Sequence, residues 1–210
     1  MVDGQIRTNK VTDERLIAAL TDLPRERFAR EAQQGRAYID DDLPLGGGRH
    51  MMEPMVLSRL IQALQLQDGD KVLVVGANTG YGAALAARMG ANVTALECDS
   101  GLADAARAAL ASLPDRLPVT VVVGTLQEGC AANGPFKAIL IEGAVEEVPG
   151  RLIEQLTGDG KLVTVQRQGQ SPVGRAVLMT RGAGTPATRV LFDANTPILP
   201  GFEGARVFAF

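Results

Sequence analysis

From residue 71 onward the sequence alternates short apolar runs with segments of helical length, and this pattern constrains the fold more than any other feature. Helical patterns at residues 80–89, 102–113 and about 148–156 separate several of the apolar runs. Strands joined by helices of this length form right-handed crossovers and therefore a parallel sheet. The nearly uninterrupted apolar character of the runs indicates that helices cover both faces. The expected strands are residues 71–75, 92–96, 118–123, 137–141 and 161–166.

Both ends of the chain depart from this alternation. Residues 174–180 and 188–192 are expected to form an antiparallel hairpin, because no helical segment fits between them. Residues 206–210 are expected to add an edge strand. Near the start, Thr12 is expected to cap a short helix, residues 35–53 to form an irregular loop, and Pro54 to begin a second helix. We therefore expect a single α/β domain, with a helical extension and loop over residues 1–54 and a doubly wound core over 55–210.

Composition narrows the function classes. The chain has 210 residues, with 21 Lys+Arg against 24 Asp+Glu, so a general basic field for nucleic acid is not expected. A single His argues against a His-rich metal site, and no metal is expected. Two cysteines without a disulfide framework, no apolar leader and no apolar run of about 20 residues favour a cytoplasmic protein without a membrane span.

A glycine-rich turn follows the first strand of the core and leads into a helix. Gly76 and Gly80 permit close approach of a ligand, and the helix offers free N–H groups to an anion. Glu97 ends the next strand, 21 residues after Gly76, where a carboxylate can accept both hydroxyls of a ribose. A tight turn without a ligand is the alternative. If a nucleoside binds, the residues leave open whether it is a nicotinamide cofactor or S-adenosylmethionine.

The loop that precedes Pro54 holds the other candidate residues. His50 carries the chain's one imidazole, the side-chain type most often used as a general base, so it is either a general base or a surface histidine. Met51 and Met52 either line an apolar pocket or belong to the core. This loop precedes the first strand and is expected to fold over the carboxyl edge of the sheet.

Taken together, these segments resemble the protein-L-isoaspartate O-methyltransferases, which use S-adenosylmethionine. The resemblance covers nearly the whole chain, in order and at the family's spacing. It implies a Rossmann-like methyltransferase sheet and methylation of the α-carboxylate of isoaspartyl residues in damaged protein, the first step of repair. The matching segments are Gln5-Ile6-Arg7, Pro24-Arg25-Glu26-Arg27-Phe28, Leu43-Pro44-Leu45-Gly46, Gly69-Asp70-Lys71-Val72-Leu73, Thr79-Gly80-Tyr81 and Glu97.

The resemblance also implies roles for individual residues. Glu97 would hold the ribose hydroxyls, and the turn at Gly76 the methionine moiety. The loop from Gly46 to Pro54 would recognise isoaspartyl peptides, which are the expected partners. The implied cofactor site comprises Gly76, Asn78, Gly80, Glu97, Thr125 and Glu142, and the implied substrate loop supplies Arg49, His50, Met52 and Glu53.

Several of these positions differ from the family's pattern. The family's loop usually reads Gly-x-Gly-Gln-Thr-x-Ser-Gln-Pro, so Met52 replaces the hydroxyl residue and donates nothing to an anion. Glu53 adds a negative charge that disfavours an anionic substrate, whereas Arg49 could pair with the substrate carboxylate. Asn78 replaces a glycine, and Thr125 stands where a carboxylate is expected.

These differences leave three hypotheses. The first is an isoaspartyl-type methyltransferase. The second is a catalytically inactive family member that acts as a binding or regulatory protein. The third, a nicotinamide-dependent oxidoreductase, is ranked last because no Tyr–Lys pair stands near the fourth strand.

Overall fold

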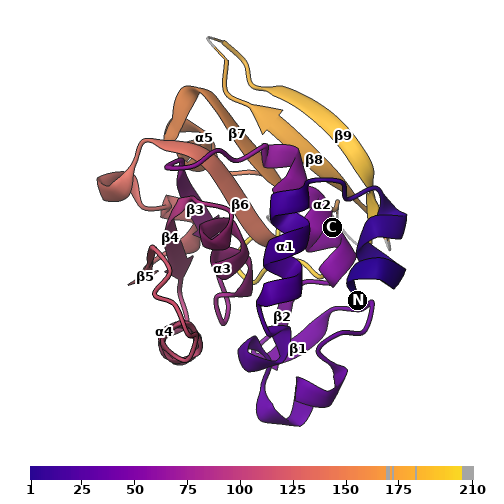
Figure 1. Cartoon of the computed structure of the whole chain (residues 1–210). Coiled ribbons are helices and arrows are strands. Elements are labelled where there is room, and N and C mark those ends of the chain that lie inside the picture. The colour runs from indigo at the N-terminus through magenta and orange to yellow at the C-terminus, as the bar shows by residue number, and fades with distance from the viewer. Residues whose placement is uncertain (169–170, 172, 183, 205–210) are drawn as a thin grey trace, which may run out of the picture.

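The computed structural model describes residues 1–168, 171, 173–182 and 184–204, and Figure 1 shows a twisted sheet with helices packed against it. The α-helices are α1 (Glu14–Asp22), α2 (Pro54–Leu64), α3 (Tyr81–Arg88), α4 (Ser100–Ala111) and α5 (Gly150–Glu154). The strands are β1 (Leu43–Gly46), β2 (Arg49–Met51), β3 (Lys71–Val75), β4 (Asn92–Glu97), β5 (Val119–Val123), β6 (Phe136–Val145), β7 (Leu156–Gln166), β8 (Gly174–Thr180) and β9 (Ala187–Ala194). Short π or 3-10 helices lie at Val2–Ile6, Arg7–Asn9, Arg25–Phe28, Glu31–Arg36, Leu126–Glu128 and Ala131–Asn133.

The main sheet has the strand order β5-β4-β3-β6-β7-β8-β9 within the described residues. The strands from β5 to β7 pair in parallel, and β8 and β9 pair antiparallel at one edge. The order reverses at β3, so the chain winds outward in both directions from this strand. The predicted doubly wound sheet with an antiparallel C-terminal hairpin is therefore confirmed.

Alternate residues of the central strands pack on opposite faces of the sheet, as the period of two requires. Val72 and Val74 of β3 belong to a cluster that includes the apolar sides of α1, α2 and α3. Leu73 and Val75 belong to a second cluster with α5 and the C-terminal segment. Both faces are thus covered, which explains why β3 reads as an uninterrupted apolar run.

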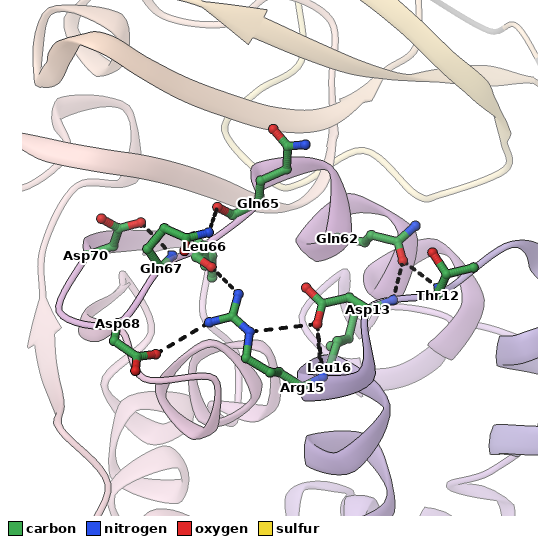
Figure 2. Close-up of polar contacts among 10 residues, drawn as sticks. All are labelled: Thr12, Asp13, Arg15, Leu16, Gln62, Gln65, Leu66, Gln67, Asp68 and Asp70. Atoms are coloured by element: carbon green, nitrogen blue, oxygen red, sulfur yellow. Dashed lines mark hydrogen bonds and ion pairs between the residues drawn. The ribbon is translucent and has the colours of Figure 1, made fainter.

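The N-terminal extension is attached to α2 by a glutamine (Figure 2). The side-chain oxygen of Gln62 accepts the backbone N–H groups of Thr12 and Asp13 at 2.6 and 3.0 Å. Asp13 caps α1, because its carboxylate accepts the N–H groups of Arg15 and Leu16 at 2.9 and 3.3 Å. The expectation that Thr12 caps this helix was wrong, since Thr12 lies one residue too early and faces Gln62.

Arg15 makes a second connection between α1 and the start of the core (Figure 2). Its guanidinium donates to the carbonyl of Leu66 and lies 3.4 Å from a carboxylate oxygen of Asp68. The connecting loop between α2 and β3 is thereby fixed to the extension. The extension therefore packs on the side of the sheet that α2 and α3 also cover (Figure 1).

The loop expected at residues 35–53 is more regular than the sequence indicated. The 3-10 helix Glu31–Arg36 includes the first two residues of this stretch, and β1 and β2 pair as an antiparallel hairpin. The connecting residues Gly46, Gly47 and Gly48 have φ values of +89°, +58° and +74°, which glycine adopts without strain. A run of three glycines therefore makes a tight turn here instead of a loose loop.

Two further observations concern the whole chain. No helix in the part of the chain that the structure describes has the length and apolar character needed to cross a membrane. The edge strand expected at residues 206–210 lies outside the described residues.

Candidate active site

Residues from three neighbouring strands meet at the carboxyl edge of the sheet. Strand β3 is paired in register with β4 and β6 up to Val75. The residues that follow on these strands are Gly76, Glu97 and Glu142. In open α/β sheets this edge is where ligands bind. The structure thus brings together three residues that the sequence assigned to a cofactor site.

Glu97 is fully buried and accepts hydrogen bonds at both oxygens. Oε1 accepts the backbone N–H groups of Cys98 and Asp99 at 2.8 and 3.1 Å, and Oε2 accepts the N–H of Asn78 at 2.8 Å. Arg49 donates Nη1 to Oε1 at 2.6 Å and Nη2 to Oε2 at 2.7 Å. This is a buried, bidentate pair, the strongest arrangement of a guanidinium and a carboxylate. Arg49 therefore occupies the face of Glu97 that was expected to hold a ribose.

The glycine-rich turn after β3 has a left-handed backbone at three positions. The φ values are +69° at Gly76, +53° at Asn78 and +92° at Gly80. Asparagine tolerates this region better than most residues, so the turn forms without the family's middle glycine. The Asn78 side chain donates from Nδ2 to the carbonyl of His50 at 3.1 Å, which attaches the turn to the β1–β2 hairpin.

Glu142 points into the interior from a bulge in β6. The pairing of β6 with β7 shifts register between Leu140 and Ala144, and Glu142 lies in that interval with only 2% of its surface exposed. Its Oε1 lies directly over Gly82 of α3, and it has no hydrogen-bond partner among the described residues. Burial raises the pKa of Glu142 to about 8, so the carboxyl is mostly protonated at neutral pH.

Of the candidate substrate residues, Arg49 and His50 lie within β2, and Met52 and Glu53 follow it. Met52 is buried, and its carbonyl accepts Nη2 of Arg25 at 2.8 Å, so the thioether belongs to the core. Glu53 is half-buried and its N–H donates to Asp42 Oδ1 at 2.7 Å. Burial, with the charges of Asp40 and Asp42, raises the pKa of Glu53 to about 7. An acidic group thus lies beside the position that was expected to contact a substrate carboxylate.

Arg25 is a site residue for which sequence analysis assigned no role. It is fully buried, donates from Nε to the carbonyl of Ala37 at 2.7 Å, and lies 4.8 Å above the ring centre of Tyr81. Desolvation lowers its pKa from the usual value. An arginine in a charged segment of sequence is normally exposed to solvent, so its burial was not expected. The sequence feature that could have indicated a role for Arg25 is its position in residues 24–28, a segment that resembles the family.

The C-terminal segment also reaches the site, which sequence analysis missed. Ala144 donates to the carbonyl of Pro197 at 2.9 Å, and Leu199 donates to the carbonyl of Ala144 at 2.8 Å. A Cβ placed on Gly76 would lie 2.9 Å from Cδ2 of Leu199, so this leucine packs directly on the turn. An apolar pair, Ile198 and Leu199, between two prolines of an aperiodic segment was the one hint in the sequence.

Little space remains between these elements. The cavity at this edge measures about 10 Å³ and is lined by Asp42, Gly48, His50, Met52, Glu142, Gly143, Thr196, Pro197, Ile198 and Leu199. A much larger hollow of about 750 Å³ lies between α1 and the end of α3, on another part of the surface. The candidate site is therefore closed in this conformation.

Thr125 differs from the other predicted cofactor residues. It is exposed beyond β5, and its carbonyl accepts the N–H of Glu128 at 3.2 Å. Among the described residues, no hydrogen bond connects it to the cluster at Glu97, and no group of three His, Cys, Asp or Glu side chains is arranged as metal ligands.

Comparison with known proteins identifies the family. The model of the protein-L-isoaspartate(D-aspartate) O-methyltransferases matches residues 1–179. The chain belongs to this family. The protein-L-isoaspartate O-methyltransferase of Methylorubrum extorquens (strain PA1) is 40% identical over 163 residues, which cover 78% of this chain and 71% of the relative. That of Roseiflexus castenholzii (strain DSM 13941 / HLO8) is 40% identical over 164 residues, covering 78% and 74%.

Solved structures of isoaspartate methyltransferases share this fold. One superposes with a TM-score of 0.82 at 22% identity and covers 97% of this chain and 67% of its own. Another, from Plasmodium falciparum in complex with S-adenosyl-L-homocysteine, has a TM-score of 0.72 at 19% identity and covers 92% and 94%. The recognised family resemblance is therefore confirmed over most of the chain.

The backbone of the site fits the family's cofactor, but two side chains above it do not. The glycine-rich turn with its positive φ values and the carboxylate of Glu97 stand where a nucleoside would bind at this edge. In the described conformation Arg49 pairs with the carboxylate of Glu97, and Leu199 covers Gly76. In this conformation S-adenosylmethionine and these two side chains cannot occupy the same atoms of Glu97 and Gly76.

Proposed function

We propose that this protein transfers a methyl group from S-adenosylmethionine to the carboxylate of isoaspartyl residues in damaged proteins. Membership of the isoaspartate methyltransferase family over residues 1–179 carries the proposal. The product would enter repair of the damaged backbone, and we place this activity in the cytoplasm. Isoaspartyl peptides and proteins would be its partners.

The preorganised carboxylate of Glu97 supports a nucleoside-binding role. Three backbone N–H groups, from Asn78, Cys98 and Asp99, fix its two oxygens in orientation. Such a carboxylate needs no reorganisation to accept a pair of hydroxyl groups, which is what positioning for methyl transfer requires. The same N–H groups would keep Glu97 in place when Arg49 is absent from it.

The substrate loop supports a modified mode of substrate binding. Met52 is buried and offers no hydroxyl, and Glu53 retains a proton up to about pH 7. A protonated carboxyl donates a hydrogen bond and repels no anion. We infer that Glu53 is compatible with a carboxylate substrate below neutral pH and disfavours it above.

The test is methyl transfer from radiolabelled S-adenosylmethionine to an isoaspartyl peptide, with the corresponding aspartyl peptide as control. We expect transfer to the isoaspartyl peptide alone, with a rate that falls above about pH 7 as Glu53 ionises. The double variant Met52→Ser/Glu53→Gln should be faster, and its rate should lose that pH dependence. No transfer by either protein at millimolar cofactor would exclude the enzymatic function.

A second candidate function is favoured by one observation. The Arg49–Glu97 pair satisfies the nucleoside carboxylate with a side chain of the same chain. In a family member that had lost catalysis and served as a binding or regulatory protein, Arg49 could stay on Glu97, because no nucleoside would need that carboxylate. Isothermal titration with S-adenosylhomocysteine separates the candidates, because a regulatory protein of this kind would not bind it.

A further inference from the structure

Arg49 and Leu199, here called the plug, come from two segments that close over the cofactor edge together. Arg49 follows the glycine turn of the β1–β2 hairpin, and Leu199 lies in the segment that returns after β9. The two segments touch, because a Cβ on Gly48 would lie 3.2 Å from Cγ of Pro200. The plug is therefore a joint structure of the hairpin and the C-terminal segment.

Arg49 competes for the atoms of Glu97 that a ribose would use. The backbone donors reach Glu97 from the strand end and the turn, and the guanidinium adds one bond to each oxygen, at 2.6 and 2.7 Å. Two ribose hydroxyls would likewise need one bond to each oxygen. Arg49 and a nucleoside diol therefore cannot occupy Glu97 at the same time.

Leu199 competes for the surface of the turn. It is 3% exposed, and its Cδ2 lies within 2.9 Å of a Cβ position built on Gly76. Nη2 of Arg49 lies 3.2 Å from the same position. The glycine that leaves room for a ligand is thus covered from above by both members of the plug.

The plug is held by contacts that can break without disrupting the main sheet. Nε of Arg49 is buried without a hydrogen-bond partner among the described residues, so its guanidinium is incompletely satisfied. Leu199 is held to β6 by the backbone bonds around Ala144. Neither interaction belongs to the hydrogen bonding within the seven-stranded sheet, so both can break while that sheet stays intact.

We propose that the plug is an autoinhibitory gate, in which Arg49 and Leu199 occupy the cofactor site until S-adenosylmethionine displaces them. The inference rests on the proposed function. An intramolecular competitor lowers the apparent affinity by the fraction of time for which the site is open. A site that is open for a tenth of the time binds about tenfold more weakly than the same site without its plug.

Isothermal titration of S-adenosylhomocysteine into the full chain tests the gate. Arg49→Gln places a neutral donor at the position where the family usually has glutamine, and Leu199→Ala uncovers Gly76. We expect each to bind about tenfold more tightly than the wild type. The matched controls are Arg107→Gln, at an exposed pair with Asp104 on α4, and Leu113→Ala, at a buried leucine beyond that helix. Both controls should bind as the wild type does.

Ligand-free thermal unfolding supplies the second measurement. Arg49→Gln should melt earlier than the wild type without ligand and show the larger upward shift with S-adenosylhomocysteine. If Arg49→Gln does not fold, Leu199→Ala carries the test. Equal affinities for the wild type and both plug variants would overturn the gate and leave the proposed function standing. Binding by none of these proteins would overturn the proposed function, and the gate with it.

Discussion

Arg25 is the largest of the side chains that have almost no exposed surface in the described structure. It donates to the carbonyls of Ala37 and Met52, and both contacts lie within the extension that bears the substrate loop. Removing the guanidinium leaves these buried acceptors without a donor, and each such group costs about 1–3 kcal/mol. Arg25 therefore ties Ala37 to Met52 and holds the substrate loop between them in place.

We predict that Arg25→Ala lowers the free energy of unfolding by about 3 kcal/mol. Urea denaturation followed by circular dichroism measures the loss. Arg107→Ala, at an exposed ion pair on α4, is the control and should change stability by less than about 1 kcal/mol. A loss for Arg25→Ala no larger than that of the control would show that the buried contacts contribute little.

Single residues of the site were predictable where their role follows from local pattern. Gly76 and Glu97 stand at strand ends, which hydrophobic runs identify, and both lie at the predicted edge. The partner of Glu97 was not predictable, because Arg49 lies 48 residues away in sequence and reaches it through a hairpin turn. The sequence suggested that Arg49 could bind a substrate carboxylate, whereas it binds a carboxylate of the protein itself.

At the scale of elements, α3 and the bulge of β6 fit together through a glycine. Gly82 lies within α3, where alanine would ordinarily raise helix stability by about 1 kcal/mol. The carboxyl group of Glu142 lies against this position, so a Cβ on Gly82 would collide with it. Since Glu142 is 2% exposed, it has little room to move aside.

We therefore predict that Gly82→Ala destabilises the protein by about 1–3 kcal/mol, against the helix propensity. In the Glu142→Ala background the same change should be neutral or stabilising, because the collision is removed. A double-mutant cycle by urea unfolding gives the coupling energy. Gly35→Ala, at a position with open space around it, is the control for replacing a glycine. A coupling energy near zero would contradict the contact.

The sequence predicted the central strands and helices, but not the β1–β2 hairpin or the bulge in β6. The central strands and the helices α2, α3 and α4 have strong apolar periodicity, and they form close to the expected residues. The β1–β2 hairpin was expected to be a loop, because a run of three glycines normally indicates a flexible segment. Their positive φ values, which make a tight turn, are known only from the structure. The bulge that directs Glu142 inward depends on the register with β7, which one strand's sequence does not carry.

At the scale of the whole molecule, the alternation of strands and helices predicted a parallel, doubly wound sheet with an antiparallel hairpin. It did not predict that the carboxyl edge of this sheet is covered. The C-terminal segment returns across the sheet and pairs Ile198 with Ala144 of β6. Its sequence contains prolines and lacks periodicity, so no local rule places it. The segment after β9 folds back onto the carboxyl edge of the sheet and covers the cofactor site there.

The stability of the whole molecule should fall as the pH rises from about 4.5 to about 8. The pKa of Glu142 is raised to about 8 and that of Glu53 to about 7, whereas the pKa of a glutamate in the unfolded chain is about 4.3. In this window the folded chain keeps protons that the unfolded chain releases, so ionisation favours unfolding. Buried Glu142 contributes a slope of up to about 1.4 kcal/mol per pH unit. Half-exposed Glu53 adds a smaller contribution of the same sign.

Glu142→Gln should flatten this slope between pH 5 and pH 8, because glutamine has no proton to lose. The variant should then be more stable than the wild type at pH 8, where the wild type bears part of the cost of a buried charge. Urea denaturation at pH 5, 6, 7 and 8 measures the slopes, with Glu147→Gln as the control at an exposed glutamate. Parallel slopes for Glu142→Gln and the wild type would mean that Glu142 is ionised in the folded protein, paired with Arg25 or Arg49. That pairing would keep its pKa low and place a full negative charge beneath the cofactor turn.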